Sequence, residues 1–240
     1  MQYDLSVITF MNKIAFISDI HGNYPALKAV LQDIDSLHIE KIYCLGDLVG
    51  YYSQINEVIN TIKSRRIECI LGNHDYAMIH NQGVIERSKT CTNVLTKQLG
   101  YIASENLDFI RSLNTSMTIQ VGDYTIFSVH GGLNDYVDEY LSDLSESYFE
   151  TLDKTITHVI TGHNHLPRVE RYGNILYANS GSVGQPRDYN PMASYVIFKE
   201  GMFTIRRIPY NIDETIQQMK IDGFPDYIAE VLRKGCKIGG

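Results

Sequence analysis

Short apolar runs alternate with helical patterns in the first half of the chain. The apolar runs are β-branched and too short for helices, which is typical of buried parallel strands. Asn23 and Ser53 stand where the N-caps of the following helices are expected. Strands are expected at 14–18, 41–45 and 67–71, and helices at 25–37 and 53–64. This order predicts a parallel βαβ layer.

The second half of the chain is rich in strands. A polar, helical stretch covers about residues 88–113, and the next two apolar runs flank Gly122-Asp123, a two-residue hairpin signal. Gly173-Asn174 and Glu200-Gly201 are expected turns. Strands are expected at 117–121, 124–129, 158–161, 175–178, 194–199 and 203–208.

Together these elements predict an α/β (α+β) fold. Two mixed β-sheets face each other with helices outside, which gives a four-layer αββα sandwich. Residues 1–240 are expected to form a single domain, because no linker, repeat or low-complexity tract divides the chain. Residues 1–10 are a candidate N-terminal extension, and residues 212–234 are expected to form a C-terminal appendage of two short helices.

The composition is globular with an acidic balance. Hydrophobic residues make up 44% and charged residues 20%, which excludes a disordered chain. The net charge of −7 gives no electrostatic basis for binding nucleic acid or an anionic membrane. The four cysteines form no Cys-x-x-Cys pair, and no signal peptide or membrane-spanning run is present. We therefore expect a cytoplasmic protein, with no membrane or nucleic-acid partner.

Side chains with metal-binding chemistry follow one strand after another. The carboxylates Asp19 and Asp47 and the amide Asn73 come just after apolar runs, and so do five of the eight histidines. These histidines are His21, His74, His130, His163 and His165. Because the carboxyl ends of parallel strands converge on one edge, these groups are expected to meet there. Oxygen and imidazole ligands without thiolate suit Mn, Fe, Zn or Co ions rather than a structural zinc.

The order of these segments resembles the calcineurin-like metallophosphoesterase superfamily. Its five sequence blocks are matched here by Asp19-Ile20-His21, Gly46-Asp47, Gly72-Asn73-His74-Asp75, His130 and Gly162-His163-Asn164-His165. The resemblance extends to the segment from Ser180 to Arg187, which is similar to the corresponding part of small bacterial and archaeal phosphoesterases.

This resemblance implies a dinuclear metal centre. One ion would be held by Asp19, His21, Asp47 and His165, and the other by Asp47, Asn73, His130 and His163, with Asp47 bridging. Manganese is the expected ion, with Fe, Zn, Ni or Co as alternatives. A water between the two ions would attack phosphorus. The implied enzyme is a metal-dependent phosphoric ester hydrolase acting on small phosphodiesters or phosphomonoesters.

Further residues are candidates for contact with the substrate. Asn73 and His74 are expected to touch the phosphoryl group, and His74 to protonate the leaving oxygen. Asp75 either orients His74 or caps the helix that follows. Arg187 is a candidate phosphate clamp, with a surface pair to Asp188 as the alternative.

The remaining residues near these blocks have weaker patterns. Tyr51 and Tyr52 directly follow the Asp47 block and are candidates for lining the cleft. Asn164, which lies between two predicted ligands, is interpreted as a spacer.

The residues after Asp47 separate the substrate classes. Related serine/threonine protein phosphatases continue the Gly-Asp block with Asp-Arg, whereas Leu48-Val49 stands here, so a protein phosphatase is disfavoured. The segment 19–23 still resembles that branch and keeps a dinucleoside polyphosphate (Ap4A-type) hydrolase open. A metal-bound scaffold or a metal-free binding module is the non-enzymatic alternative, although every ligand position is filled. The expected partner is a small phosphorylated substrate, and the oligomeric state is left open.

Overall fold

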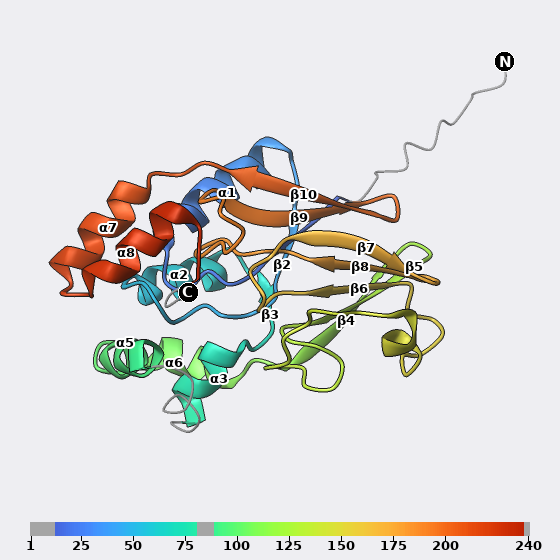
Figure 1. Cartoon of the computed structure of the whole chain (residues 1–240), viewed down its shortest axis with the longest axis horizontal. Helices are drawn as coiled ribbons and strands as arrows, with labels where there is room; N and C mark the ends of the chain where they lie inside the picture. The colour runs from blue at the N-terminus through green and yellow to red at the C-terminus, as the bar shows by residue number, and fades with distance from the viewer. Residues whose placement is uncertain (1–12, 81–88, 238–240) are drawn as a thin grey trace, which may run out of the picture.

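The computed structural model describes residues 13–80 and 89–237 and contains two five-stranded sheets (Figure 1). The strand order is β10-β9-β1-β2-β3 in the first sheet and β4-β5-β6-β8-β7 in the second. The strands are β1 (Ile14–Ile17), β2 (Lys41–Cys44), β3 (Glu68–Cys69), β4 (Ser116–Val121), β5 (Tyr124–Val129), β6 (His158–Thr161), β7 (Arg168–Tyr172), β8 (Ile175–Asn179), β9 (Ala193–Lys199) and β10 (Met202–Ile208). Helices flank both sheets, so the predicted fold class is confirmed.

The helices form two groups at the sides of the sheets. In Figure 1, α7 and α8 lie beside α1, while α3, α5 and α6 lie together below them. The helices are α1 (Tyr24–Ser36), α2 (Ile55–Ser64), α3 (Asn73–His80), α5 (Lys89–Leu99), α6 (Ser104–Arg111), α7 (Ile212–Ile221), α8 (Asp226–Lys234) and the 3-10 helix η1 (Glu146–Phe149). Among the residues described, no helix has the length and apolar character that crossing a bilayer requires.

The predicted βαβ layer is present, and one of its two predicted caps is correct. β1 pairs in parallel with β2, and β2 with β3. Asn23 caps α1 by accepting a hydrogen bond of 3.3 Å from the amide of Ala26. The cap predicted at Ser53 is wrong, because α2 begins at Ile55 after Gln54, and no side-chain hydrogen bond caps it.

Alternate residues of β1 supply two different cores. Ile14 and Phe16 point into the layer between the two sheets, where the Phe16 ring stacks on Tyr43 with centroids 5.6 Å apart. Ala15 and Ile17 point the other way, into the core beneath α1 and α2. Because side chains alternate across a strand, a fully apolar strand with an apolar layer on each face is what a four-layer sandwich requires.

The second sheet contains one strand that the sequence pattern did not indicate. β7 (Arg168–Tyr172) is an edge strand that pairs only with β8, in antiparallel register. Its sequence carries charged side chains on a largely exposed surface, as edge strands often do. Without an apolar run there was no signal to separate it from a loop. The predicted hairpin at Gly122-Asp123 is confirmed, with Val121 paired to Tyr124.

Parallel strands in both sheets direct their following loops to one edge of the sandwich. β5, β6 and β8 run parallel within the second sheet, as β1, β2 and β3 do in the first. Loops from the two sheets are hydrogen-bonded to each other there. The amide of Val183, after β8, donates to the carbonyl of Ser18, after β1, over 2.9 Å.

Asn23 connects this edge to the C-terminal helices. Its side chain is fully buried, donates to the carbonyl of Gly184 over 2.8 Å and accepts from the hydroxyl of Thr215 in α7 over 2.8 Å. One amide group therefore joins the start of α1, the loop after β8 and the appendage.

We expect Asn23→Ala to lower the free energy of unfolding by at least about 2 kcal/mol, because it removes a helix cap and leaves buried polar groups unpaired. Asn211→Ala is the matched control. Asn211 caps α7 through a single exposed hydrogen bond to the amide of Glu214, and its loss should cost about 1 kcal/mol or less. Urea denaturation of both variants measures the difference. Equal losses would contradict the connecting role of Asn23.

Candidate metal centre

Four predicted ligands form a compact buried cluster. Asp19, His21, Asp47 and His165 each offer a ligand atom, and these atoms all lie within 4.8 Å of one another. His21 Nε2 is 3.2 Å from His165 Nε2, and His165 Nε2 is 3.0 Å from Asp19 Oδ1. Protein ligands bind divalent transition ions at about 2.0–2.2 Å, so atoms with these separations can surround one ion.

The other predicted ligands form a second group beside the first. Asn73 Oδ1 lies 2.9 Å from His163 Nδ1 and 3.2 Å from His130 Nε2. Asp47 Oδ2 lies 3.4 Å from His130 Nε2 and 3.6 Å from His21 Nε2, which belong to different groups. The structure thus brings all the predicted ligands together, with the Asp47 carboxylate between the two groups.

Main-chain carbonyls fix the orientation of three imidazole rings. The Nδ1 atom of His21 lies 2.8 Å from the carbonyl of Val49, and that of His130 lies 2.7 Å from the carbonyl of Leu45. His165 Nδ1 makes a short hydrogen bond to the carbonyl of Gln185. A carbonyl oxygen only accepts, so each Nδ1 carries the proton. In the neutral ring, Nε2 then presents its lone pair to the cluster, as in metal-binding histidines.

The electrostatics of the imidazoles fit a cation. Burial lowers the pKa of His21, His163 and His165, so these rings are neutral at physiological pH. A metal ligand must be unprotonated, and these three rings meet that condition.

The two buried carboxylates, Asp19 and Asp47, need positive charge close to them. Burial alone would raise the pKa of Asp19 and Asp47, but nearby imidazoles, His165 for Asp19 and His130 for Asp47, hold both values below the usual range. For His130, burial lowers the pKa, while Asp47 and then Asp19 raise it to about 10. Two buried carboxylates that remain ionised require cations close by, and a pair of divalent ions would supply that charge.

Five of the predicted ligands share an unusual backbone conformation. The φ angle is 54° at Asp19, 53° at His21, 57° at Asp47, 63° at His163 and 59° at His165. Non-glycine residues rarely adopt this left-handed region, and each instance costs on the order of 1 kcal/mol or more. Hydrogen bonds from the surroundings hold it, such as His21 N–H to the Asp47 carbonyl at 2.9 Å. Such strain is typical of functional sites.

The glycines that precede two ligand blocks make room for carboxylates. A Cβ atom on Gly72 would lie 2.2 Å from Asp47 Oδ1, and one on Gly162 would lie 2.1 Å from Ser18 Oγ and 2.6 Å from Asp19 Oδ2. All these distances are far below van der Waals contact. Glycine is therefore required before Asn73 and His163 because the neighbouring carboxylate occupies the space of a side chain.

The predicted role of Asp75 in orienting His74 is wrong. The fully buried Asp75 carboxylate accepts hydrogen bonds from four main-chain amides, those of Asp47, Leu48, Val49 and Gly72. Burial, and next the charge of Asp47, raises the pKa of Asp75 to about 7. The bond to Gly72 agrees with the capping alternative. The main effect of Asp75 is to fix the loop that carries Asp47.

His74 lies beside the ligand cluster. Its amide donates to Asp47 Oδ1 over 2.8 Å, and its ring lies 4.7 Å from that of His21 between centroids. The Nδ1 atom of His74 is 3.6 Å from Cys91 Sγ in α5. Burial lowers the pKa of His74 to about 4.

Arg187 lies at the edge of the cluster and does not pair with Asp188. Its guanidinium donates to the hydroxyl of Tyr51 over 3.1 Å and to Gln185 Oε1 over 2.9 Å. Asp188 instead forms an ion pair of 2.7 Å with Arg207, so the surface-pair alternative is wrong. Tyr51 is half-buried beside Arg187, and its ring lies 4.7 Å from that of His21 between centroids. Tyr52 is fully buried in the core against α7 and α8, and its predicted place in the cleft is wrong.

Sequence reasoning missed a residue that fixes the loop after Asp47. Gln98 is fully buried in α5, accepts from the amide of Gly50 over 2.9 Å and donates to the carbonyl of Tyr52 over 2.7 Å. Gln98 interrupts an otherwise apolar stripe with Val94 and Leu95. A polar residue on the buried face of a predicted helix indicates a buried hydrogen bond, so the sequence contains a signal for Gln98.

Tyr140 and the role of Asn164 were also missed. The Tyr140 ring lies 3.9 Å from the His163 ring between centroids. Asn164 is more than a spacer, since it donates to the carbonyl of Leu141 over 2.7 Å and accepts from the Leu141 amide over 3.2 Å. The loop that carries Tyr140 has no hydrophobic periodicity, so no sequence pattern pointed to it.

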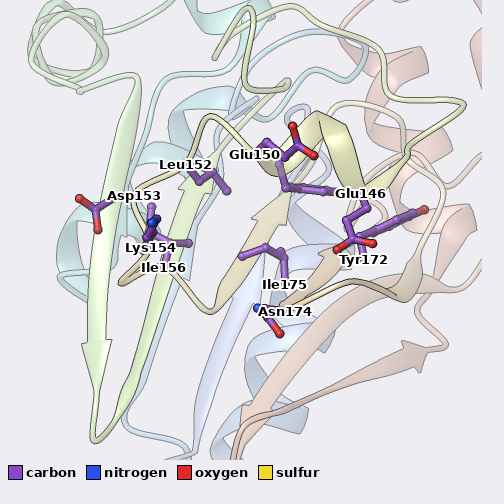
Figure 2. Close-up of a pocket in the computed structure, with 10 residues that line it drawn as sticks. Glu146, Glu150, Leu152, Asp153, Lys154, Ile156, Tyr172, Asn174 and Ile175 are labelled. Atoms are coloured by element: carbon purple, nitrogen blue, oxygen red, sulfur yellow. The ribbon is translucent and has the colours of Figure 1, made fainter.

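A separate cavity of about 330 Å³ lies between η1 and the turn that joins β7 to β8 (Figure 2). Glu146, Asp153, Tyr172 and Asn174 line it, and none of its lining residues belongs to the predicted site. It therefore contributes nothing to the chemistry of the metal centre.

Comparisons with known proteins agree with this geometry. Residues 12–201 match the calcineurin-like phosphoesterase superfamily domain. The uncharacterized protein MJ0912 of Methanocaldococcus jannaschii is 34% identical, over 92% of this chain and 98% of its own. The crystal structure of a metallophosphoesterase from Sphaerobacter thermophilus has a TM-score of 0.79 and 28% identity, over 94% of this chain and 99% of its own. The crystal structure of the hypothetical protein PH1004 from Pyrococcus horikoshii OT3 has a TM-score of 0.85 and 23% identity, over 94% of this chain and 99% of its own. This similarity shows the same fold.

The position of Asp47 gives a prediction about metal content. Asp47→Asn removes one negative charge from both ligand groups, while the amide oxygen can still accept from His74 N–H. We expect elemental analysis to find about two ions per chain in the wild type and fewer in Asp47→Asn, together with loss of hydrolysis. Asp143→Asn, which changes an exposed carboxylate, is the control and should keep its metal. Full metal occupancy in Asp47→Asn would contradict a shared carboxylate.

Proposed function

The chain belongs to the calcineurin-like phosphoesterase superfamily and is a metal-dependent phosphoesterase, and we propose that it hydrolyses small phosphodiesters and phosphomonoesters. The observation that carries this proposal is the Asp47 carboxylate, placed 3.6 Å from His21 Nε2 and 3.4 Å from His130 Nε2. When bound, two divalent ions there would polarise the phosphoryl oxygens and lower the pKa of a water.

We assign the metal ligands by their grouping. One ion would be held by Asp19, His21, Asp47 and His165, and the other by Asp47, Asn73, His130 and His163. Manganese is our first choice, with Fe, Zn, Ni and Co as alternatives, because the ligands are carboxylate, amide and imidazole without thiolate. We further propose a cytoplasmic location, which rests on the sequence alone.

Two residues outside the ligand groups would act on the substrate. The His74 ring stands beside His21, where it can donate a hydrogen bond to the leaving oxygen of a bound ester. Arg187 adds a fixed cation at the edge of the centre, because Gln185 and Tyr51 hold its guanidinium. Asn73 would contact substrate through its position at the second ion.

The absence of arginine after Asp47 favours small diesters. Leu48 and Val49 are fully buried, and their amides bond to Asp75, so this segment offers no cation to the cleft. A monoester dianion has three non-bridging oxygens and gains most from extra cations, whereas a diester monoanion has two that the ions alone can bind. The net charge of −7 supports a small phosphorylated partner rather than a nucleic acid.

The role of His74 predicts a separation of turnover from metal binding. We expect His74→Ala to keep its metal content and to lower kcat by about 10²–10⁴-fold, the range for loss of a general acid. The loss should be smaller for a nitrophenolate leaving group, which scarcely needs a proton. Elemental analysis and steady-state kinetics on two leaving groups check this. Loss of metal from His74→Ala would show instead that His74 is a ligand.

The role of Arg187 is tested by comparing an aryl phosphodiester with the matching monoester. We expect kcat/KM for the diester to be at least comparable to that for the monoester, and Arg187→Ala to reduce the monoester reaction more. Arg171→Ala, which removes an exposed arginine of β7, is the control. A strong monoester preference in the wild type that collapses in Arg187→Ala would refute the diester preference and make Arg187 the missing clamp.

A further inference from the structure

Cationic and aromatic side chains from three distant segments meet beside the two ligand groups. The Tyr140 ring covers His163 at 3.9 Å between centroids and is 49% exposed. Lys237 Nζ lies 5.6 Å from the centroid of the same ring. Arg187 donates to the hydroxyl of Tyr51 and also interacts with the side chain of Tyr140. One tyrosine thus contacts a predicted ligand and two cations.

The position of Tyr140 is fixed by its own loop. The two hydrogen bonds between the Asn164 side chain and the main chain of Leu141, at 2.7 Å and 3.2 Å, hold the residue that follows Tyr140. Asn164 lies between the predicted ligands His163 and His165. The ring is therefore anchored to the metal centre itself.

The segment that follows α8 places Lys237 beside the Tyr140 ring. Gly235 follows the last residue of α8 as its C-cap, in the left-handed conformation with φ of 61°. A Cβ atom on Gly235 would lie 2.7 Å from the main chain of Asn190. The amide of Tyr189 donates to the Gly235 carbonyl over 2.8 Å. This docking fastens the segment, red after α8 in Figure 1, to the loop that carries Arg187.

Arg187 and Lys237 differ from the two arginines of β10 in their partners. Within residues 13–80 and 89–237, neither Arg187 nor Lys237 forms an ion pair with a carboxylate, whereas Arg206 and Arg207 nearby in sequence are paired with Asp33 and Asp188. Burial lowers the pKa of Arg187, but Tyr51 and then Tyr140 raise it above its usual value, so it stays charged. In a chain of net charge −7, unpaired cations beside a metal centre indicate an anionic ligand.

We propose that Lys237, held on the face of Tyr140, forms an anion subsite for a second phosphate group of the substrate, next to the phosphoryl group at Arg187. The inference rests on the proposed function and narrows it to small molecules that carry two adjacent phosphates. It also gives the C-terminal appendage a role in substrate selection. Lys237 is a positioning residue for substrate and takes no part in bond breaking.

The test measures binding of two phosphate probes to the full-length, metal-loaded protein. Isothermal titration calorimetry compares the binding of inorganic phosphate with that of methylenediphosphonate, which carries two linked phosphonates. The cell and the syringe contain the same excess of metal ion. We expect Lys237→Ala to weaken the binding of methylenediphosphonate by about two- to fivefold, the value of one exposed charge pair. Binding of inorganic phosphate and hydrolysis of an aryl diester should be unchanged.

Two variants control the result. Lys237→Arg should retain the binding of methylenediphosphonate, because it keeps the charge. Lys234→Ala, an exposed lysine in the last turn of α8, should behave like the wild type. If Lys237→Ala weakens the binding of both probes equally, or weakens the binding of neither, the proposed subsite is wrong. If the wild type hydrolyses no ester but the difference between the probes persists, the subsite stands and the proposed function fails.

Discussion

The burial of two ionised carboxylates, Asp19 and Asp47, at neighbouring strand ends is the constraint on which this structure depends. Moving a carboxylate out of water costs several kcal/mol unless positive charge or hydrogen bonds replace the solvent. The His130 imidazole, together with the divalent ions that the two ligand groups can hold, provides that charge. The left-handed backbone of five predicted ligands and the glycines before Asn73 and His163 follow from the same constraint, because it brings the side chains within a few ångströms of one another.

A second set of buried polar residues holds the loops that present these ligands. The Asp75 carboxylate accepts hydrogen bonds from four amides of the segments around Asp47 and Gly72. Gln98, in α5, accepts from the amide of Gly50 in the same loop. Asn164 plays the same part for the loop of Tyr140. Asp75 and Gln98 are fully buried and Asn164 is partly buried, and the hydrogen bonds of all three are made to main chain. Such bonds set the position of a loop whatever its sequence, which explains why irregular segments can carry an ordered site.

The C-terminal helices belong to the same arrangement. Asn23 ties α7 to the start of α1 and to the loop after β8, and Gly235 ties the end of α8 to the loop that carries Arg187. The two contacts of Asn23 join residues that are far apart in the sequence, since Gly184 is 161 residues away and Thr215 is 192 residues away. The segment after α8 therefore lies beside the candidate metal centre, where Lys237 adds a positive charge near Tyr140.

The sequence by itself determined the βαβ layer, the facing sheets and the set of side chains that cluster at one sheet edge. These follow from local rules, because apolar runs specify strands and the residues after parallel strands share one edge. Only the tertiary structure decided the partners of Asp75, the burial of Tyr52, the edge strand β7 and the places of Tyr140 and Lys237. Each depends on what a side chain meets across long sequence separations, such as the 27 residues between Leu48 and Asp75, and no periodicity in the chain encodes that. A pattern can say that a residue lies at the edge of a sheet, but the packing of other segments decides what it touches.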